Sequence, residues 1–552
     1  MKTKVLYSIW WNVIGIIILS TNVQSQSWIG LHHDGGSAVD GADAISIDST
    51  GKIFIAGLGQ GVMTFDSIIV QCKGAGDCIV SRYDASLNPV WVRRGGGYDP
   101  IWSDYGTGLF VDHDGNIYVV GCYQGIAEFN SITVTPYGQY DIFIAKYDND
   151  GNCLWVKTAG GPGQDFCTSV VFDGSGNFYL TGMISWTAVF DTITVPNTST
   201  DNILFLAKYN MGGTCEWVVT PSGTGVSDGS AVAYCNDRVY MTANYTGTIS
   251  LGIHQVTSIS SYRHLVAQFD PAGNCLWVET VQGTGTSYAL SAIADYSGNC
   301  ILTGTFQGSL TIGPDSVTSA QNWDIFLSKY NRDGTFQWIQ QAHASTGSDY
   351  SVGSKGRGLS TFPTGDVLLT GQFCGTINWG VYSVTGTSWE DLFVAKFDSS
   401  GECLGTGHGT NSIGGGIAIT PDGLLMVCGS MHDTAIYDSQ IIVSYGEQDI
   451  LLAKLTDITG SESLSFEKNE DLVIYANPNE GRCTIIIPDE FLNNDNLTLL
   501  VYDNKGTVIQ SVPVRFTEDH ISINIAAQAR GIYQVILTDG QQQYSGKIVF
   551  TE

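Results

Sequence analysis

The stretch that decides the fold is YGTGLFVDHDGNIYVVG at residues 105–121, followed by DIFIAKYDNDGNCLWVKTAGG at residues 141–161. Both contain short runs rich in Val, Ile, Tyr and Phe that end in Gly, Asp and Asn. This pattern is typical of β-strands joined by tight turns. The pattern recurs along the chain until about residue 456, and such internal repetition predicts a repeat architecture.

Three landmarks define the repeat: a Gly-bounded hydrophobic strand, a strand ending like Ala-Lys-Tyr-Asp, and a tryptophan strand. The first landmark occurs seven times if a degenerate copy at residues 237–243 is included. Successive tryptophans lie 60 to 64 residues apart, a period that fits four strands plus an extra hairpin. Gly405 replaces the tryptophan in the sixth unit, which we expect to be the least stable one. The tryptophans are Trp28, Trp91, Trp155, Trp217, Trp277 and Trp338, and we interpret them as packing between units.

The order of the landmarks predicts a closed ring. The chain opens with a tryptophan strand at Ser27–Leu31 that has no preceding partner, and its repeats end at Asp449–Lys454 without a following tryptophan strand. An open solenoid, which is the alternative, would expose unpaired edges at both ends. We therefore predict an all-β fold: a seven-bladed β-propeller closed by the N-terminal strand.

The units resemble the SBBP-type β-propeller repeats of secreted bacterial proteins. The resemblance rests on Gly115-Asn116-Ile117-Tyr118, on residues 176–182 (GNFYLTG) and on residues 141–148 (DIFIAKYD), and it covers about residues 41–456. This family shares an architecture and no common activity, so the resemblance implies the fold alone.

The first 25 residues predict a signal peptide. Lys2 and Lys4 precede an apolar run that is too short for a membrane span and ends in a small-residue cleavage pattern. The alternative is an uncleaved anchor. No later stretch is long enough to span a bilayer. The formal charge is −29 and becomes about −31 without the leader, which argues against nucleic acid as a partner.

The C-terminal region predicts a separate module. Residues 457–471 break the repeat and are interpreted as a linker; short strand-like runs follow in residues 472–552 and predict a small β-sandwich. The domain prediction is therefore a signal peptide at 1–25, the propeller at 26–456, the linker at 457–471 and the sandwich at 472–552.

This module resembles the type A C-terminal sorting domain of the type IX secretion system. Four motifs occur in the family's order, although Ala476 replaces the first proline of the opening motif. The resemblance implies contact with the type IX machinery, export, and an extracellular or cell-surface location after the domain is removed. The matching residues are Asn477, Pro478, Gly481, Tyr502, Asp503, Gly506, Gly531, Tyr533 and Lys547.

The cysteines and the acidic turns have simpler explanations than disulfides or metal. Cys153 and its counterparts recur at one position of the repeat, so we expect them to lie too far apart to form disulfides. We interpret them as small buried apolar residues. Cys72 and Cys78 could close a local disulfide. Turns such as Asp112–Asn116 resemble calcium loops but lack the bidentate Glu of an EF-hand, so we interpret their aspartates as hairpin turn residues. We predict neither a metal nor a cofactor.

The sequence contains no recognisable catalytic constellation, and we predict a binding protein rather than an enzyme. Aromatic and histidine residues outside the repeat fall in crossovers and hairpins that open on one face, where they suit a glycan or protein ligand. The competing interpretation is that they cover blade edges. A polysaccharide-active enzyme and a purely structural surface protein are the alternative functions, and we expect a monomer. The candidate ligand-binding residues are Trp102, Trp323, Trp379, Trp389, His33, His343 and His408.

Overall fold

The structure is a computed structural model. It describes residues 27–198, 200–346, 350, 353–456, 458, 472, 474–475, 482–487, 491, 497–502, 508–514, 520–525, 531–538 and 543–550. The predicted signal peptide and nearly all of the predicted linker lie outside the described residues. The described chain is built from β-strands, as predicted, and none of its elements is a helix long and apolar enough to cross a membrane.

Residues 28–455 form successive groups of four antiparallel strands. The strands are rich in β-branched and aromatic residues, which favour β-structure. The first strands are β2 (Gly41–Ile47), β8 (Tyr105–Val111), β14 (Phe166–Phe172), β21 (Val226–Cys235), β25 (Thr286–Ala294), β29 (Lys355–Thr361) and β35 (Ser412–Ile419). The second strands are β3 (Ile53–Gly59), β9 (Ile117–Gln124), β15 (Asn177–Ile184), β22 (Arg238–Leu251), β26 (Cys300–Ile312), β30 (Val367–Phe373) and β36 (Leu425–Met431).

The third and fourth strands complete each group. The third strands are β6 (Asp77–Tyr83), β12 (Tyr140–Tyr147), β18 (Ile203–Asn210), β23 (His254–Phe269), β27 (Asp315–Tyr330), β33 (Asp391–Phe397) and β39 (Asp449–Leu455). The fourth strands are β7 (Pro89–Gly97), β13 (Cys153–Gly160), β19 (Cys215–Val219), β24 (Cys275–Thr280), β28 (Phe336–Ala344), β34 (Cys403–Gly409) and, beside β39, β1 (Trp28–Gly36).

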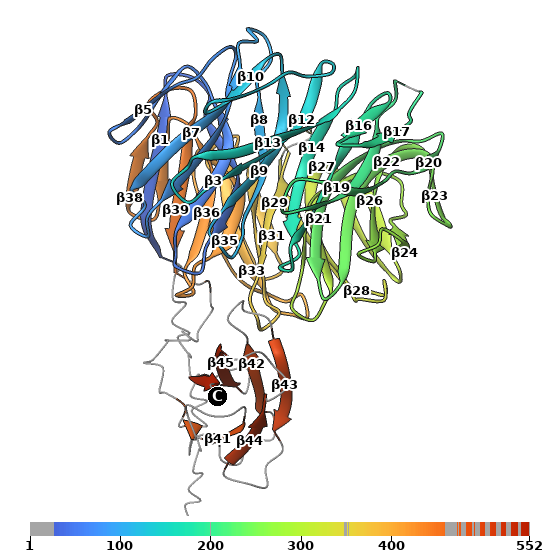
Figure 1. The fold of residues 1–552 in the computed structure, drawn as a ribbon. Coiled ribbons are helices and arrows are strands. Elements are labelled where there is room, and N and C mark those ends of the chain that lie inside the picture. The colour runs from blue at the N-terminus through green and yellow to red at the C-terminus, as the bar shows by residue number, and fades with distance from the viewer. Residues whose placement is uncertain are drawn as a thin grey trace, which may run out of the picture.

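The N-terminal strand β1 lies in the sheet of the last repeat. It pairs antiparallel with β39, with Leu31 opposite Ala453 and His33 opposite Leu451. Figure 1 shows the blue β1 next to the orange β39. The first strands also contact one another in sequence from β2 to β35, and β35 contacts β2 in turn. The two ends of the repeat region therefore lie side by side.

In four repeats, an extra hairpin pairs with the sheet before it. The hairpin β4 (Val62–Phe65) and β5 (Ile68–Gln71) extends from the second strand of its own repeat, but β4 pairs with the end of β1. The same pairing joins later hairpins to β7, β13 and β28. These hairpins cover strand ends that would otherwise remain open edges. They are β10 (Ala127–Phe129) with β11 (Ile132–Val134), β16 (Ala188–Phe190) with β17 (Ile193–Val195), and β31 (Thr376–Trp379) with β32 (Tyr382–Thr385); a further pair is β37 (Thr434–Tyr437) with β38 (Gln440–Val443), and the short β20 (Ser222–Gly223) pairs with β22.

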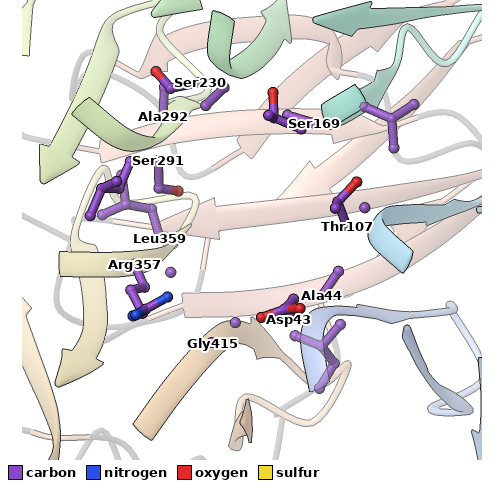
Figure 2. Close-up of a pocket in the computed structure, with 18 of the residues that line it drawn as sticks. Asp43, Ala44, Thr107, Ser169, Ser230, Ser291, Ala292, Arg357, Leu359 and Gly415 are labelled. Carbon is purple, nitrogen blue, oxygen red and sulfur yellow. The ribbon is translucent and has the colours of Figure 1, made fainter. Parts of the chain in front are cut away.

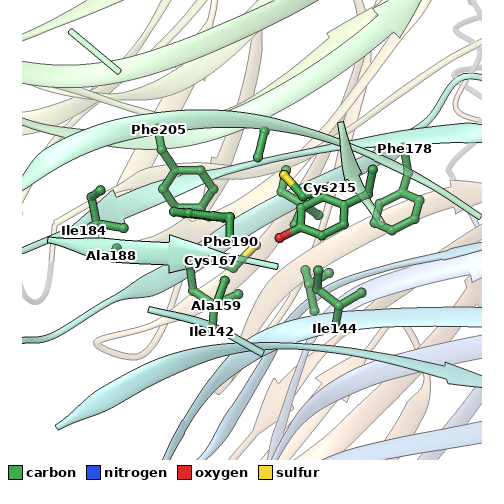
Figure 3. Packing of buried hydrophobic residues seen from close by; sticks show 14 of the residues in the cluster. Ile142, Ile144, Ala159, Cys167, Phe178, Ile184, Ala188, Phe190, Phe205 and Cys215 are labelled. Atoms are coloured by element: carbon green, nitrogen blue, oxygen red, sulfur yellow. The ribbon is translucent and has the colours of Figure 1, made fainter. Parts of the chain in front are cut away.

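Hydrophobic clusters fill the space between neighbouring sheets. One cluster combines Ile142 and Ile144 of β12 with Phe178 of β15 and Phe205 of β18, all fully buried. Figure 3 shows these side chains meeting between the two sheets. Another cluster joins β2 and β3 to residues of β36 and β39, so the first and last repeats share buried apolar surface.

The repeated tryptophans pack onto the next sheet, which fits the predicted role between units. Trp91 Nε1 donates to the Asn149 carbonyl oxygen at 3.0 Å, and Trp277 Nε1 donates to the Arg332 carbonyl oxygen at 3.2 Å. A glycine with positive φ lies under each ring: an ideal Cβ on Gly151 would come within 2.8 Å of Trp91. The glycine is needed both for the turn and for the close approach of the indole.

Trp28 does not occupy the repeated tryptophan position, contrary to the sequence-based alignment. Trp28 pairs with Leu455, the register at which Cys153 pairs with Tyr147 in the second repeat. Gly30 instead stands where the tryptophan would be. The side chain of Leu87 from the first repeat approaches Gly30, with its Cδ1 atom 3.5 Å from an ideal Cβ there.

The aspartates of the repeat turns bind backbone groups, as the turn interpretation predicts. Asp148 Oδ1 accepts hydrogen bonds from the backbone N–H groups of Asp150 and Asn152 at 2.9 and 2.8 Å. The same arrangement occurs at Asp112. All thirteen cysteines are free thiols, so Cys72 and Cys78 do not form the disulfide that the sequence left open.

The C-terminal region consists of two small sheets around one apolar cluster. Leu499, Val501, Val535, Leu537 and Ile548 are buried at its centre. Of the sorting motif, Tyr502, Gly531, Tyr533 and Lys547 lie on strands, and Asn477, Pro478, Gly481, Asp503 and Gly506 lie outside the described residues. The sheets are β40 (Ile474–Tyr475), β41 (Arg482–Ile486) and β44 (His520–Asn524), and β43 (Val508–Val514), β42 (Leu497–Tyr502), β45 (Gly531–Thr538) and β46 (Gln543–Phe550).

Candidate functional site

Because the strands are antiparallel, different connections lie at the two ends of the strands. At one end of the strands, each fourth strand connects to the first strand of the next repeat, and each second strand connects to its third strand. We call this end the crossover face. The opposite end of the strands carries the turns that join first to second strands and third to fourth strands, and we call it the turn face. The candidate ligand-binding residues all belong to segments at or near the crossover face.

Two of the candidate tryptophans are exposed on the crossover face. Trp389, before β33, is 73% exposed, and Trp102, between β7 and β8, is 51% exposed. Trp102 contacts the edge of Tyr140 at a centroid distance of 6.2 Å. These two indoles present large apolar surfaces to solvent, whereas tryptophan side chains are mostly buried in folded proteins.

The other two candidate tryptophans are buried, which corrects the expectation that they are open loop aromatics. Trp379 in β31 is 2% exposed and packs edge-on against Phe397 at 5.0 Å. Trp323 in β27 is 8% exposed and lies against Tyr288 and Tyr350. Both pack as core residues because the hairpin or strand that carries them folds onto a neighbouring sheet.

The three candidate histidines are held by separate partners and do not converge. His33 Nδ1 lies 2.8 Å from Asp449 Oδ2, and the ring stacks on Tyr445. The exposed His343 lies 3.3 Å from Asp324. His408 contacts the edge of Phe373. Among the described residues, these histidines form no common group of metal-ligating atoms.

One mixed cluster in the described residues has metal-type donors: His32, Asp34 and Asp66, with atoms within 4.8 Å of one another. Asp34 Oδ2 already accepts from the Tyr83 hydroxyl at 2.8 Å and lies 2.9 Å from His32 Nε2. Burial acts to lower the pKa of His32, but the hydrogen bond and charge of Asp34 outweigh it and raise that pKa. A local ion pair accounts for this cluster without a metal.

Sequence reasoning did not identify the residues that line the channel at the centre of the repeat region. The first strands surround a cavity of about 230 Å³. Figure 2 shows side chains from different strands pointing into this space. Most positions carry small or hydroxyl side chains: Thr107, Thr168 and Ser230 occupy equivalent places, and the hydroxyl groups of both threonines donate to a carbonyl of the next first strand.

Asp43 and Arg357 are the charged residues among those lining the channel. Arg357 donates through Nε and Nη2 to Gln372 Oε1, at 2.9 and 2.7 Å, and this holds its guanidinium in place. Asp43 is exposed to the channel, yet protein atoms surround it closely; burial raises the pKa of Asp43, and the charge of Arg357 opposes this rise. Aligning the repeats would have revealed both as the charged residues at a position that carries Thr107, Thr168 and Ser230 in three other repeats.

The C-terminal module matches a known family. Residues 473–551 fit the family described as "Secretion system C-terminal sorting domain". The module is a type IX secretion sorting domain. The chain is therefore a secreted or cell-surface protein whose tail interacts with the secretion machinery.

The chain also has a more distant relative. A stretch of 180 residues is 28% identical to an uncharacterized WD repeat-containing protein of Acanthamoeba polyphaga mimivirus, covering 28% of this chain and 12% of that protein. This chain thus spans only a small part of that relative's length.

Two solved structures match most of the chain at low similarity. One is the Dos1 propeller (TM-score 0.40, 10% identity, 78% of this chain and 94% of that chain). The other is a PL25 polysaccharide lyase, an ulvan lyase (TM-score 0.40, 11% identity, 78% and 95%). Independently of these matches, the successive antiparallel sheets, whose first strands lie side by side around one cavity, have the arrangement of a β-propeller.

Proposed function

We propose that residues 26–456 form one seven-bladed propeller, built from SBBP-type repeats and closed by β1, between a cleaved leader at 1–25 and a linker at 457–471. The pairing of β1 with β39 supports this proposal, because it gives the last repeat its fourth strand. The contact of β35 with β2 supports it as well, because it returns the row of first strands to its start.

We further propose that this propeller is an exported binding scaffold for an extracellular glycan or protein. The exposure of Trp389, at 73%, carries the proposal. Indole rings stack well on sugar faces and on peptide side chains, and an exposed tryptophan on a rigid scaffold loses little conformational entropy when it binds. Trp102 supplies a second exposed indole on the same face.

A polysaccharide-active enzyme is the second candidate, and Asp43 in the channel is the observation that favours it. A carboxylate with a raised pKa beside an arginine is a common catalytic feature. However, Asp43 is the only carboxylate among the residues lining this channel, whereas glycoside hydrolysis ordinarily uses two. The cavity is also smaller than the roughly 300–1,000 Å³ of ordinary ligand pockets. We therefore favour binding over catalysis.

A glycan array and a polysaccharide-degradation assay on the exported protein test these functions. The binding proposal predicts a ligand whose affinity falls about five- to twelvefold in Trp389→Ala, the loss expected from one stacking contact of ~1–1.5 kcal/mol. Tyr296→Ala is the matched control, since Tyr296 is a 53% exposed aromatic on the turn face, and it should bind normally. Degradation that Asp43→Asn abolishes would favour the enzyme instead, and equal binding by both aromatic variants would refute the binding face.

A further inference from the structure

Two buried aspartates face each other between the second and third sheets. Asp141 lies at the start of β12 and Asp165 directly before β14, and both side chains are fully buried. An ideal Cβ on Gly160 would lie 2.3 Å from Asp141 Oδ1 and 2.9 Å from Asp165 Oδ2. These two carboxylate oxygens are therefore no more than about 5 Å apart, beside a residue that has no side chain to separate them.

One of the two facing oxygens has no hydrogen-bond donor. Asp165 is fully used: Oδ2 accepts from the Gly161 N–H at 2.7 Å and Oδ1 from the Ser185 N–H at 2.9 Å. Asp141 Oδ2 accepts from the Tyr137 N–H, but Asp141 Oδ1 is buried without a partner. Buried polar atoms in folded proteins are nearly always satisfied, so an orphaned carboxylate oxygen needs an explanation.

Where serine stands at the position of Asp165, the aspartate that corresponds to Asp141 has a hydrogen-bond donor for its Oδ1 atom. Ser412 stands at the position of Asp165, and there the N–H of Asn411, the counterpart of Gly161, donates to Asp391 Oδ1 at 2.7 Å. In the fifth sheet the Ala344 N–H donates to Asp324 Oδ1 at 3.0 Å in the same way. In the pair, the Gly161 N–H donates to Asp165 instead of to Asp141. Asp141 Oδ1 therefore lacks this donor and faces the carboxylate of Asp165.

No cationic side chain compensates this pair. Among the described residues, neither Asp141 nor Asp165 takes part in an ion pair. Burial raises the pKa of Asp141 to about 7, with the charge of Asp165 adding to the rise, and burial raises the pKa of Asp165 to about 6. Two buried carboxylates this close do not both ionise at neutral pH unless a positive charge lies between them.

Equivalent pairs flank this one, but each has a basic neighbour. Asp77 and Asp104 meet at Gly96, and Arg94 lies 3.3 Å from Asp77. Asp40 and Asp449 meet at Gly35, and His33 lies 2.8 Å from Asp449. The pair formed by Asp141 and Asp165 is the one that most needs an external cation.

We propose that Asp141 and Asp165 hold a calcium-class cation between the second and third sheets. Asp141 Oδ1 and Asp165 Oδ2 are the protein ligands, since hard divalent cations take oxygen ligands at about 2.3–2.6 Å. The ion satisfies the orphaned oxygen, neutralises the pair and ties two sheets together. This site is separate from the exposed turn aspartates, whose oxygens already bind backbone N–H groups.

Calcium titration of the full exported chain tests the site. Calorimetry with CaCl₂, and thermal melts in CaCl₂ or EDTA, are recorded at pH 7.5 for the wild type and for Asp165→Ser. The wild type should bind calcium and melt about 2–4 °C higher with it. Asp165→Ser should lose this site and most of the shift, yet fold normally, because serine occupies this position in the sheets that contain Ser354 and Ser412.

Asp150→Ser is the control, since Asp150 is an exposed acidic turn residue, and it should keep the full calcium shift. An unchanged wild-type melting temperature in calcium would overturn the proposal, as would an equal calcium shift in Asp165→Ser. A third result would also overturn it: a wild-type stability that falls, as the pH rises from 5 to 8, by the same amount with and without calcium. That result would mean that a proton shared by the two carboxylates, and not a calcium ion, neutralises the pair.

Discussion

Ile458 occupies the space that Gly405 leaves open on the sixth sheet. Gly405 pairs with Lys396 at the register where Trp338 pairs with Lys329, and an ideal Cβ on Gly405 would lie 2.6 Å from Ile458 Cγ2. Ile458 is 4% exposed although it follows the last repeat strand. The chain leaving the repeat region thus fills the place of the missing tryptophan and covers the sheet that the sequence marked as weakest.

Replacing Ile458 with alanine should therefore destabilise the repeat region. Removing a buried isoleucine side chain costs about 2–4 kcal/mol, from lost burial and from the cavity that remains. The free energy of unfolding, measured by urea denaturation, should fall by this amount in Ile458→Ala. Ile253→Ala is the control, since Ile253 is exposed, and should change stability by less than about 0.5 kcal/mol. Equal stabilities of the two variants would show that Ile458 does not seal the sheet.

The buried His264 predicts a loss of stability in acid. Its ring stacks on Phe326 at 4.5 Å, Nδ1 lies 3.0 Å from Ser287 Oγ, and burial lowers the pKa of His264 to about 3. The unfolded chain takes up this proton near pH 6.5 and the folded chain only near pH 3. Stability should therefore fall as the pH drops below about 6.5, by ~1.4 kcal/mol for each pH unit.

His264→Leu isolates this effect, because Leu204 occupies the equivalent position in the third repeat. Between pH 7.5 and pH 5 the wild type should lose about 2 kcal/mol more stability than the variant in urea denaturation. The same pH slope in both proteins would mean that His264 is not a buried neutral histidine.

The linker at residues 457–471 predicts the site where the sorting domain is removed. It is the most polar stretch between the repeats and the C-terminal module, and polar segments between domains are readily cut by proteases. Intact-mass analysis of the exported protein should give a C-terminus within these residues. Recovery of an exported protein that still ends at Glu552 would contradict processing there.

The repeat architecture was predictable from sequence because it depends on local chemistry repeated many times. The strand composition, the turn aspartates and the extra hairpin are each set within a few residues, and the structure has them where expected. Trp28 was misassigned because sequence spacing alone does not fix strand register: Gly30, not Trp28, lies opposite Lys454, where Trp155 lies opposite Lys146 in the second repeat.

The candidate site was less predictable because burial depends on distant contacts. Trp379 and Trp389 both lie near the same hairpin, yet one packs against Phe397 and the other faces solvent. Likewise, the approach of Asp141 to Asp165 depends on how two sheets meet. No local pattern in the sequence distinguishes such residues.

The most direct test of the account is the removal of residues 26–31, which supply the first part of β1. Thermal unfolding and amide hydrogen exchange are compared between this variant and the full exported chain. The account predicts a melting temperature lower by many degrees and faster exchange in β39, because β39 loses its outer partner. An unchanged melting curve, with equal protection of Ile450–Lys454, would contradict closure of the ring by the N-terminal strand.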